Sequence, residues 1–121
     1  MVKVVLITGA SSGLGLSTAS HLQKIGYQVY GTSRNPEKNT INLPFPLIPL
    51  EITNSISIDS CVALVLKKAG RIDVLINNAG IFLPGKITEE EDGILEKTMN
   101  TNLYSAYYLT KKLAPRLIAQ K

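Results

Sequence analysis

A glycine-rich stretch near the N-terminus, residues 8–15 (Thr-Gly-Ala-Ser-Ser-Gly-Leu-Gly), has residue types and spacing suited to binding a phosphate group. It follows an apolar, β-branched run at residues 2–7 and precedes a segment with helical spacing. A strand that turns into a helix directs several backbone N–H groups, and the positive end of the helix dipole, at one point. In this interpretation Gly9 permits a sharp turn, Gly13 lets the backbone approach a phosphate, and Gly15 lets the helix pack closely.

Two serines inside the stretch, Ser11 and Ser12, add hydroxyl donors, and Leu14 separates the last two glycines. The spacing is Gly-x-x-x-Gly-x-Gly, which differs from the Gly-x-Gly-x-x-Gly of the better-known dinucleotide fingerprint. A glycine-rich turn that only joins a strand to a helix is the alternative. The other motifs of the chain distinguish a phosphate-binding loop from a simple connecting turn.

A second candidate, Ser33 and Arg34, lies at the end of the next predicted strand, residues 27–32. In a dinucleotide-binding fold an acid near this place accepts hydrogen bonds from the adenosine ribose hydroxyls. This segment has no carboxylate, which would repel a 2′-phosphate, whereas a guanidinium holds a phosphate with two charge-assisted hydrogen bonds. We therefore expect NADP(H) rather than NAD(H) as the cofactor. An ordinary surface arginine is the alternative interpretation of Arg34.

The elements that must position these residues follow from the periodicity of the chain. Helical spacing with a following glycine predicts helices over residues 12–25 and 58–69, and β-rich runs predict further strands over residues 47–52 and 72–76. The order β-α-β-β-α-β-α predicts an α/β fold, a doubly wound parallel sheet of the Rossmann type that stops after the fourth strand and its following helix. In such a sheet the carboxyl ends of the strands meet at one crevice, where the motifs converge.

Four segments carry further signals for a turn, for burial or for a helix end. Residues 35–39 form a polar turn, too short for a helix. The apolar run at residues 72–76 is typical of a strand buried on both faces. Residues 88–91 (Thr-Glu-Glu-Glu) resemble a capping box, which predicts that the last helix begins there. Pro115 is expected to kink or end the last part of that helix.

Length and composition limit the class of protein. A chain of 121 residues is at most one domain, so residues 1–121 are taken as a single nucleotide-binding domain. The net charge of +4 comes from scattered lysines and arginines, which argues against a nucleic-acid partner. The longest apolar run falls far short of the roughly 20 residues of a membrane span. We expect no membrane partner and a cytoplasmic location, and the single Cys61 and His21 do not suggest a metal site.

The chain resembles the short-chain dehydrogenase/reductase family. The resemblance rests on the glycine-rich stretch after the first strand and on residues 77–80 (Asn-Asn-Ala-Gly) after the fourth, and it covers essentially the whole chain. It implies cofactor contacts from Gly9, Ser11, Ser12, Gly13, Leu14 and Gly15, from Ser33 and Arg34, and from Asn78, Ala79 and Gly80. It also implies adenine recognition just after the third strand, where Glu51, followed by Ile52, takes the place of the usual aspartate.

The same resemblance places Asn102 where the family has a catalytic asparagine that holds a water in a proton relay. Ser105 stands where the family commonly has a glycine. The alternative is that Asn102 is only a polar residue on the surface of the helix. The family's reaction also needs a serine and a Tyr-x-x-x-Lys pair on a later helix. Tyr107 with Lys111 and Tyr108 with Lys112 have that spacing, but they share the helix of Asn102, and we reject both.

We therefore expect the cofactor-binding portion of an NADP(H)-dependent oxidoreductase, inactive by itself. The complete enzyme would transfer hydride between the nicotinamide and a small-molecule carbonyl or secondary alcohol, and we expect it to be a homo-oligomer. A non-catalytic nucleotide-binding or self-associating Rossmann fragment is the alternative.

Overall fold

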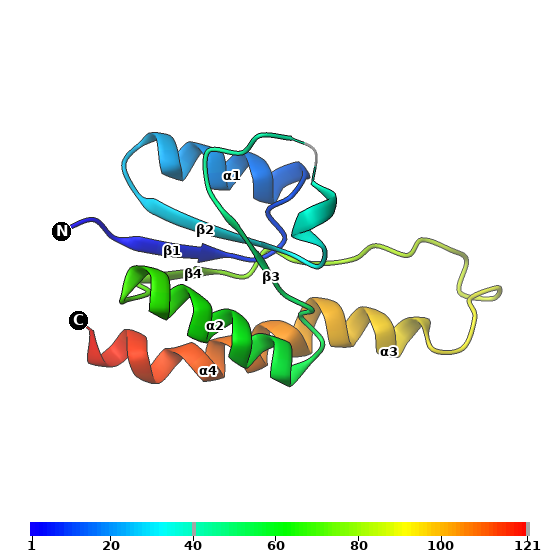
Figure 1. The fold of residues 1–121 in the computed structure, drawn as a ribbon. Coiled ribbons are helices and arrows are strands. Elements are labelled where there is room, and N and C mark those ends of the chain that lie inside the picture. Colours follow the sequence, from blue (N-terminus) through cyan, green and yellow to red (C-terminus); the bar gives the residue numbers. More distant parts are fainter. Residues whose placement is uncertain (40, 121) are drawn as a thin grey trace.

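The computed structural model describes residues 1–39 and 41–120, and its centre is a four-stranded parallel β-sheet (Figure 1). The strands are β1 (Val4–Ile7), β2 (Gln28–Ser33), β3 (Leu47–Pro49) and β4 (Val74–Ile76), arranged in the order β3-β2-β1-β4. The chain adds strands outward from β1 to β3 and then crosses to the other side of β1. This is the predicted Rossmann-like sheet, and its topological switch point lies between β1 and β4.

Helices cover both faces of the sheet. Helix α1 (Gly13–Lys24) lies on one face, and α2 (Ser55–Ala69) and α4 (Ser105–Ala119) lie on the other (Figure 1). Successive side chains of a strand point to opposite faces. The second and fourth residues of β1 accordingly pack with α1, and the first and third pack with α2 and α4. All four are buried, which explains why the sequence of this strand is uninterrupted apolar residues.

The ends of α2 follow local capping chemistry. The Asn54 side chain accepts a hydrogen bond from the backbone N–H of Ser57 at 3.0 Å, which satisfies one donor of the first turn. Gly70 ends the helix in the left-handed conformation, with φ of +78°. Between β2 and β3 the described residues include the short 3₁₀ turn η1 (Pro36–Lys38), in agreement with the predicted polar turn.

The two outer strands differ from the central ones in burial. Val74, Leu75 and Ile76 of β4 are all only half-buried, so the prediction of a strand buried on both faces was wrong. The reason is position, because β4 pairs with β1 alone and forms one edge of this sheet. Strand β3 forms the other edge, which is where a proline such as Pro49 is tolerated in a strand.

The last helical region begins later than its sequence predicts. Helix α3 (Ile94–Met99) starts after Gly93, whose φ is +93°, and not at the predicted capping box of residues 88–91. The left-handed Gly93 interrupts the helical path, so the acidic run stays in a turn. The helix then continues through a π-helical turn, η2 (Asn100–Tyr104), into α4. Pro115 lies inside α4 and does not end it.

Within residues 1–39 and 41–120, no helix is long and apolar enough to cross a membrane. Over the same two ranges, no three His, Cys, Asp or Glu side chains gather as a metal ion would require.

Candidate functional site

The loops after β1 and β4 are joined by a buried threonine. The side chain of Thr8 is 1% exposed, and its Oγ1 accepts hydrogen bonds from the backbone N–H groups of Asn78 (3.0 Å) and Ala79 (2.9 Å). The Asn78 amide donates in return to the carbonyl oxygens of Thr8 (3.1 Å) and Gly9 (3.0 Å). Because β1 and β4 are parallel neighbours, these hydrogen bonds bring both predicted motifs to the switch point of the sheet.

Two glycines of the first loop are required by this junction. Gly9 has a φ of +68°, and a Cβ atom there would lie 2.9 Å from the Cα of Ala79. A Cβ atom on Gly15 would lie 2.0 Å from the carbonyl oxygen of Gly9 and 2.5 Å from the amide nitrogen of Asn78. Gly15 thus lets α1 approach the loop itself and the Asn78 side chain.

The remaining glycine of the loop differs from both. Gly13 has a φ of +58°, and a Cβ atom there would meet nothing within 4 Å among the described residues. The next residue, Leu14, is 81% exposed. Ser12, the N-cap of α1, makes no side-chain capping hydrogen bond, and the first turn of α1 contains no acidic residue. The first N–H groups of α1 are therefore available to an anion.

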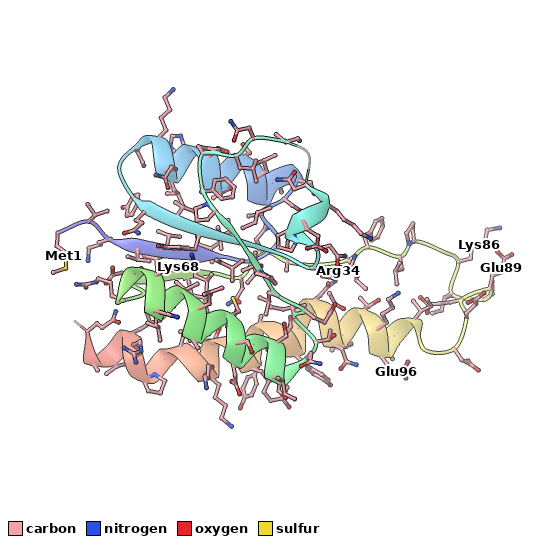
Figure 2. All side chains as sticks on the ribbon, viewed as in Figure 1. Met1, Arg34, Lys68, Lys86, Glu89 and Glu96 are labelled. Carbon is pink, nitrogen blue, oxygen red and sulfur yellow. The ribbon has the colours of Figure 1, made fainter. Side chains whose placement is uncertain are left out.

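Strand β2 contributes to the same place through its last residues. Thr32 accepts a hydrogen bond at Oγ1 from the N–H of Gly9 (3.2 Å), and its carbonyl accepts one from Ala10 (2.9 Å). Ser33 Oγ accepts from the N–H of Asn35 at 3.3 Å. Arg34 is exposed at the carboxyl end of β2, beside η1 (Figure 2). In the part of the chain that the structure describes, Arg34 forms no ion pair.

These loops enclose a cleft of about 770 Å³ along the carboxyl edge of the sheet. Of the residues expected to contact the cofactor, nine line it: Gly9, Ser11, Ser12, Ser33, Arg34, Glu51, Ile52, Ala79 and Gly80. Four others do not, namely Gly13, Leu14, Gly15 and Asn78. Asn78 holds the loop through its side-chain amide, and Gly15 lies close against the loop backbone.

Glu51 lines the cleft just after β3. Its Oε1 accepts a hydrogen bond from the Thr53 hydroxyl at 2.9 Å, and its backbone N–H donates to the Ser57 hydroxyl at 2.8 Å. The backbone of Glu51 is thereby held against the start of α2. Among the described residues, a threonine hydroxyl and no cation contacts its carboxylate.

Asn102, the expected catalytic residue, lies outside the lining of the cleft and holds its rim. Its Oδ1 accepts from the N–H of Ile81 at 2.7 Å, and its Nδ2 donates to the carbonyl of Ile81 at 2.8 Å. Asn102 is in the middle of η2, and Gly80 permits the approach, since a Cβ there would lie 3.2 Å from Asn102 Oδ1. In this structure Asn102 positions the loop after β4.

Several residues of the site were missed from the sequence. Thr8 and Thr32 connect the loops, and Lys38, Lys97 and Thr101 line the cleft. A small hydroxyl residue next to a glycine-rich turn, buried at a strand end, could have suggested Thr8. Nothing in the spacing could have suggested Lys97, because its place depends on where α3 begins.

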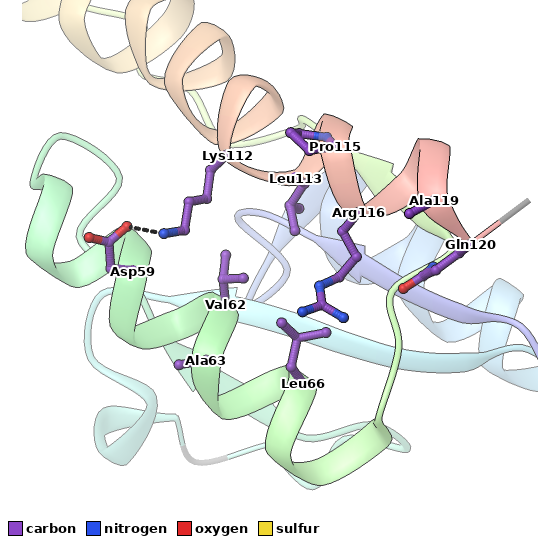
Figure 3. A pocket seen from close by; sticks show the side chains of 10 residues that line it. All are labelled: Asp59, Val62, Ala63, Leu66, Lys112, Leu113, Pro115, Arg116, Ala119 and Gln120. Atoms are coloured by element: carbon purple, nitrogen blue, oxygen red, sulfur yellow. Dashed lines mark ion pairs between the residues drawn. The ribbon is translucent and has the colours of Figure 1, made fainter.

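A second hollow, of about 630 Å³, lies between α2 and α4 (Figure 3). Asp59 and Lys112 form an ion pair of 3.0 Å across it, and Arg116 extends over Leu66. None of the predicted site residues lines this hollow.

Comparison with known proteins agrees with this geometry. The family model for short chain dehydrogenases matches residues 3–121, and the chain belongs to this family. A 3-ketodihydrosphingosine reductase from Bacteroides thetaiotaomicron is 41% identical over 116 residues, which cover 93% of this chain and 41% of the relative. The chain thus spans less than half the length of that relative.

Two solved structures show the same fold. A 3-ketoacyl-(acyl-carrier-protein) reductase from Brucella melitensis, in complex with NADH, superposes with a TM-score of 0.84 at 31% identity. The match covers 94% of this chain and 50% of that one. ElxO with NADP bound superposes with a TM-score of 0.79 at 34% identity, over 94% and 50% of the two chains. Within this group of structures, therefore, both forms of the nicotinamide cofactor are found.

Proposed function

We propose that this chain is the NADP(H)-binding portion of an oxidoreductase that transfers hydride between the nicotinamide and a carbonyl or secondary alcohol. The observation that supports the cofactor most directly is the charge around the cleft. Arg34, Lys38 and Lys97 line it, against the single carboxylate of Glu51. An excess of cations beside the open N-terminus of α1 suits a ligand with several phosphates.

Each part of the cleft has a role in this proposal. The first turn of α1, with Ser11 and Ser12, would hold the pyrophosphate, and the open space at Gly13 leaves room for it. Ser33 and Arg34 would hold the 2′-phosphate, and Glu51 with Ile52 would contact the adenine. Ala79 and Gly80 would line the ribose. NADP(H), when bound, supplies the hydride or its acceptor; these residues bind and orient it.

The proposal also assigns the reaction to residues other than the tyrosines of α4. Tyr107 is 60% exposed, and neither it nor Tyr108 lines the cleft, which supports the rejection of both Tyr-x-x-x-Lys pairs. We expect the 121-residue chain to bind cofactor and to reduce no carbonyl compound. Sustained NADPH consumption by the pure chain with any carbonyl substrate would contradict this.

The cofactor preference is tested by the affinity of wild type and Arg34→Ala for NADPH and NADH, measured by isothermal titration calorimetry. A hydrogen bond to a charged group contributes about 1.5–3 kcal/mol, so NADPH affinity should fall roughly 10- to 100-fold. NADH affinity should change little, because NADH has no 2′-phosphate. Equal losses for both cofactors would refute the proposed role of Arg34 in binding the 2′-phosphate.

We also propose that the protein self-associates. Leu103, Tyr107 and Ile118 are more than half exposed in the helical segment formed by η2 and α4, and surfaces of this kind favour association. Sedimentation equilibrium should show a species larger than the monomer. A monomer at all concentrations would exclude this and also the alternative of a self-associating, non-catalytic fragment.

A further inference from the structure

Lys38 is a second cation that the fold brings to the same end of the cleft as Arg34. The chain leaves β2 at Ser33 and turns back through η1, where the N–H of Lys38 donates to the carbonyl of Asn35 at 3.0 Å. This single turn separates the two cations by only four positions. Both line the cleft, and both are exposed.

Among the described residues, neither cation has an anionic partner. Across residues 1–39 and 41–120 the ion pairs are Arg71 with Asp73 and Lys112 with Asp59. Glu37, between the two cations in sequence, does not line the cleft, and the glycine-rich stretch carries no charge. Two neighbouring cations without a partner repel each other, and a bound dianion would convert this repulsion into attraction.

We propose that Lys38 determines cofactor specificity together with Arg34, by binding the same 2′-phosphate. This inference rests on the proposed NADP(H) function. The two side chains are suited to different tasks, because a guanidinium binds phosphate oxygens in a planar fork and an ammonium acts as a compact point charge. A phosphate monoester carries close to two negative charges at pH 7, which matches one arginine plus one lysine.

The test compares two nucleotides that differ only in the phosphate concerned, 2′,5′-ADP and 5′-AMP, each titrated calorimetrically into the 121-residue chain. Lys38→Gln should weaken 2′,5′-ADP binding about three- to tenfold, the range between an exposed ion pair and a charged hydrogen bond. Binding of 5′-AMP should stay within about twofold, since no charge on it faces Lys38. Lys38→Arg keeps the charge and should restore most of the affinity for 2′,5′-ADP.

Lys68→Gln is the matched control, because it removes the same charge at a place far from the cleft. Lys68 is exposed in the last turn of α2, away from Arg34 (Figure 2). Lys68→Gln should leave the affinities for 2′,5′-ADP and 5′-AMP unchanged. An equal loss in Lys38→Gln and Lys68→Gln would mean a general effect of net charge and would overturn the proposal.

A double-mutant cycle separates a shared phosphate from two independent effects. If Arg34 and Lys38 bind one phosphate, the losses in Arg34→Ala and Lys38→Gln should not add in the double variant. Strict additivity would overturn the shared site. If wild type does not prefer 2′,5′-ADP over 5′-AMP, the NADP(H) proposal fails as well. If wild type and Arg34→Ala behave as proposed and Lys38→Gln binds normally, only the inference on Lys38 fails.

Discussion

Thr8 and Asn78 are hydrogen-bonded to each other in both directions. The Thr8 hydroxyl accepts from the N–H of Asn78 at 3.0 Å, and the Asn78 side-chain amide donates to the carbonyl of Thr8 at 3.1 Å. These two residues belong to the loops after β1 and β4, which are 70 positions apart in sequence. The cleft at the switch point therefore depends on a polar junction as well as on the apolar core beneath it.

Thr8→Val tests this junction, because valine has nearly the same shape but accepts no hydrogen bond. The N–H groups of Asn78 and Ala79 would lose their acceptor, and we expect the free energy of unfolding to fall by roughly 1–3 kcal/mol. Urea denaturation measures it. Thr8→Ser keeps the hydroxyl and should cost less than Thr8→Val. A valine variant as stable as wild type would show that the junction contributes nothing to stability.

The glycines of the first loop should respond differently to alanine. Gly15→Ala places a methyl group 2.0 Å from a backbone oxygen, so α1 and the loop must separate, at a cost of roughly 1–3 kcal/mol or more. In Gly13→Ala the new methyl group meets no neighbouring atom. The variant should lose only the cost of a left-handed alanine, about 1–2 kcal/mol of the free energy of unfolding.

Binding separates these two variants further. Gly13→Ala should fold and still bind NADPH more weakly than wild type, because the methyl group occupies the space assigned to the pyrophosphate. Thermal unfolding and NADPH titration of both variants test this. Gly13→Ala with normal NADPH affinity would contradict the role given to that space.

Much of this arrangement could be predicted because it follows from local patterns and one topological rule. The apolar run of β1, the glycines around α1 and the β-rich segment of β2 each specify an element within a few residues. Once the strands are parallel, their carboxyl ends must share an edge. Gly9, Arg34 and Ala79 therefore line one cleft although their motifs are far apart in sequence.

Other features depend on contacts that no local pattern records. The acids at residues 89–91 favour a helix start, but the left-handed Gly93 places that start at Ile94. The π-helical turn shifts one set of hydrogen bonds to i→i+5, which apolar periodicity over five residues does not reveal. The contact of Asn102 with Ile81 was missed for the same reason.

Asn102 should stabilise the loop after β4 through its two hydrogen bonds to Ile81. Asn102→Ala removes both, and we expect a loss of about 1 kcal/mol and faster hydrogen exchange of the Ile81 amide. Asn102→Asp keeps an acceptor for that amide and should protect it better than alanine does. Exchange measured by NMR checks both variants. Unchanged protection in Asn102→Ala would mean that the loop is held by other contacts.

Cys61 should be unreactive in the native protein. Its side chain is 1% exposed in α2, and burial raises the pKa of the thiol to about 11. Since the thiolate is the reactive species, a thiol reagent at pH 8 should label Cys61 slowly in buffer and rapidly in urea. Rapid labelling in buffer would show that α2 opens readily from the sheet.

Asp73 should make stability depend on pH in the acid range. Its Oδ2 accepts a hydrogen bond from the N–H of Val4 at 2.8 Å, and Arg71 Nε lies 2.9 Å from both of its oxygens. The hydrogen bonds from Arg71 lower the pKa of the Asp73 carboxyl below its ordinary value, and the Val4 N–H acts in the same direction against partial desolvation.

Because the folded-state pKa is the lower one, this stabilisation is complete above the unfolded-state pKa, near 3.9, and is lost as the pH falls through the folded-state value. Asp73→Asn should therefore be less stable than wild type at pH 7, and the difference in free energy of unfolding should shrink below about pH 4. Urea denaturation from pH 7 to pH 3 measures this difference. A difference that stays constant over that range would mean that the asparagine acts through packing and not through the lost charge.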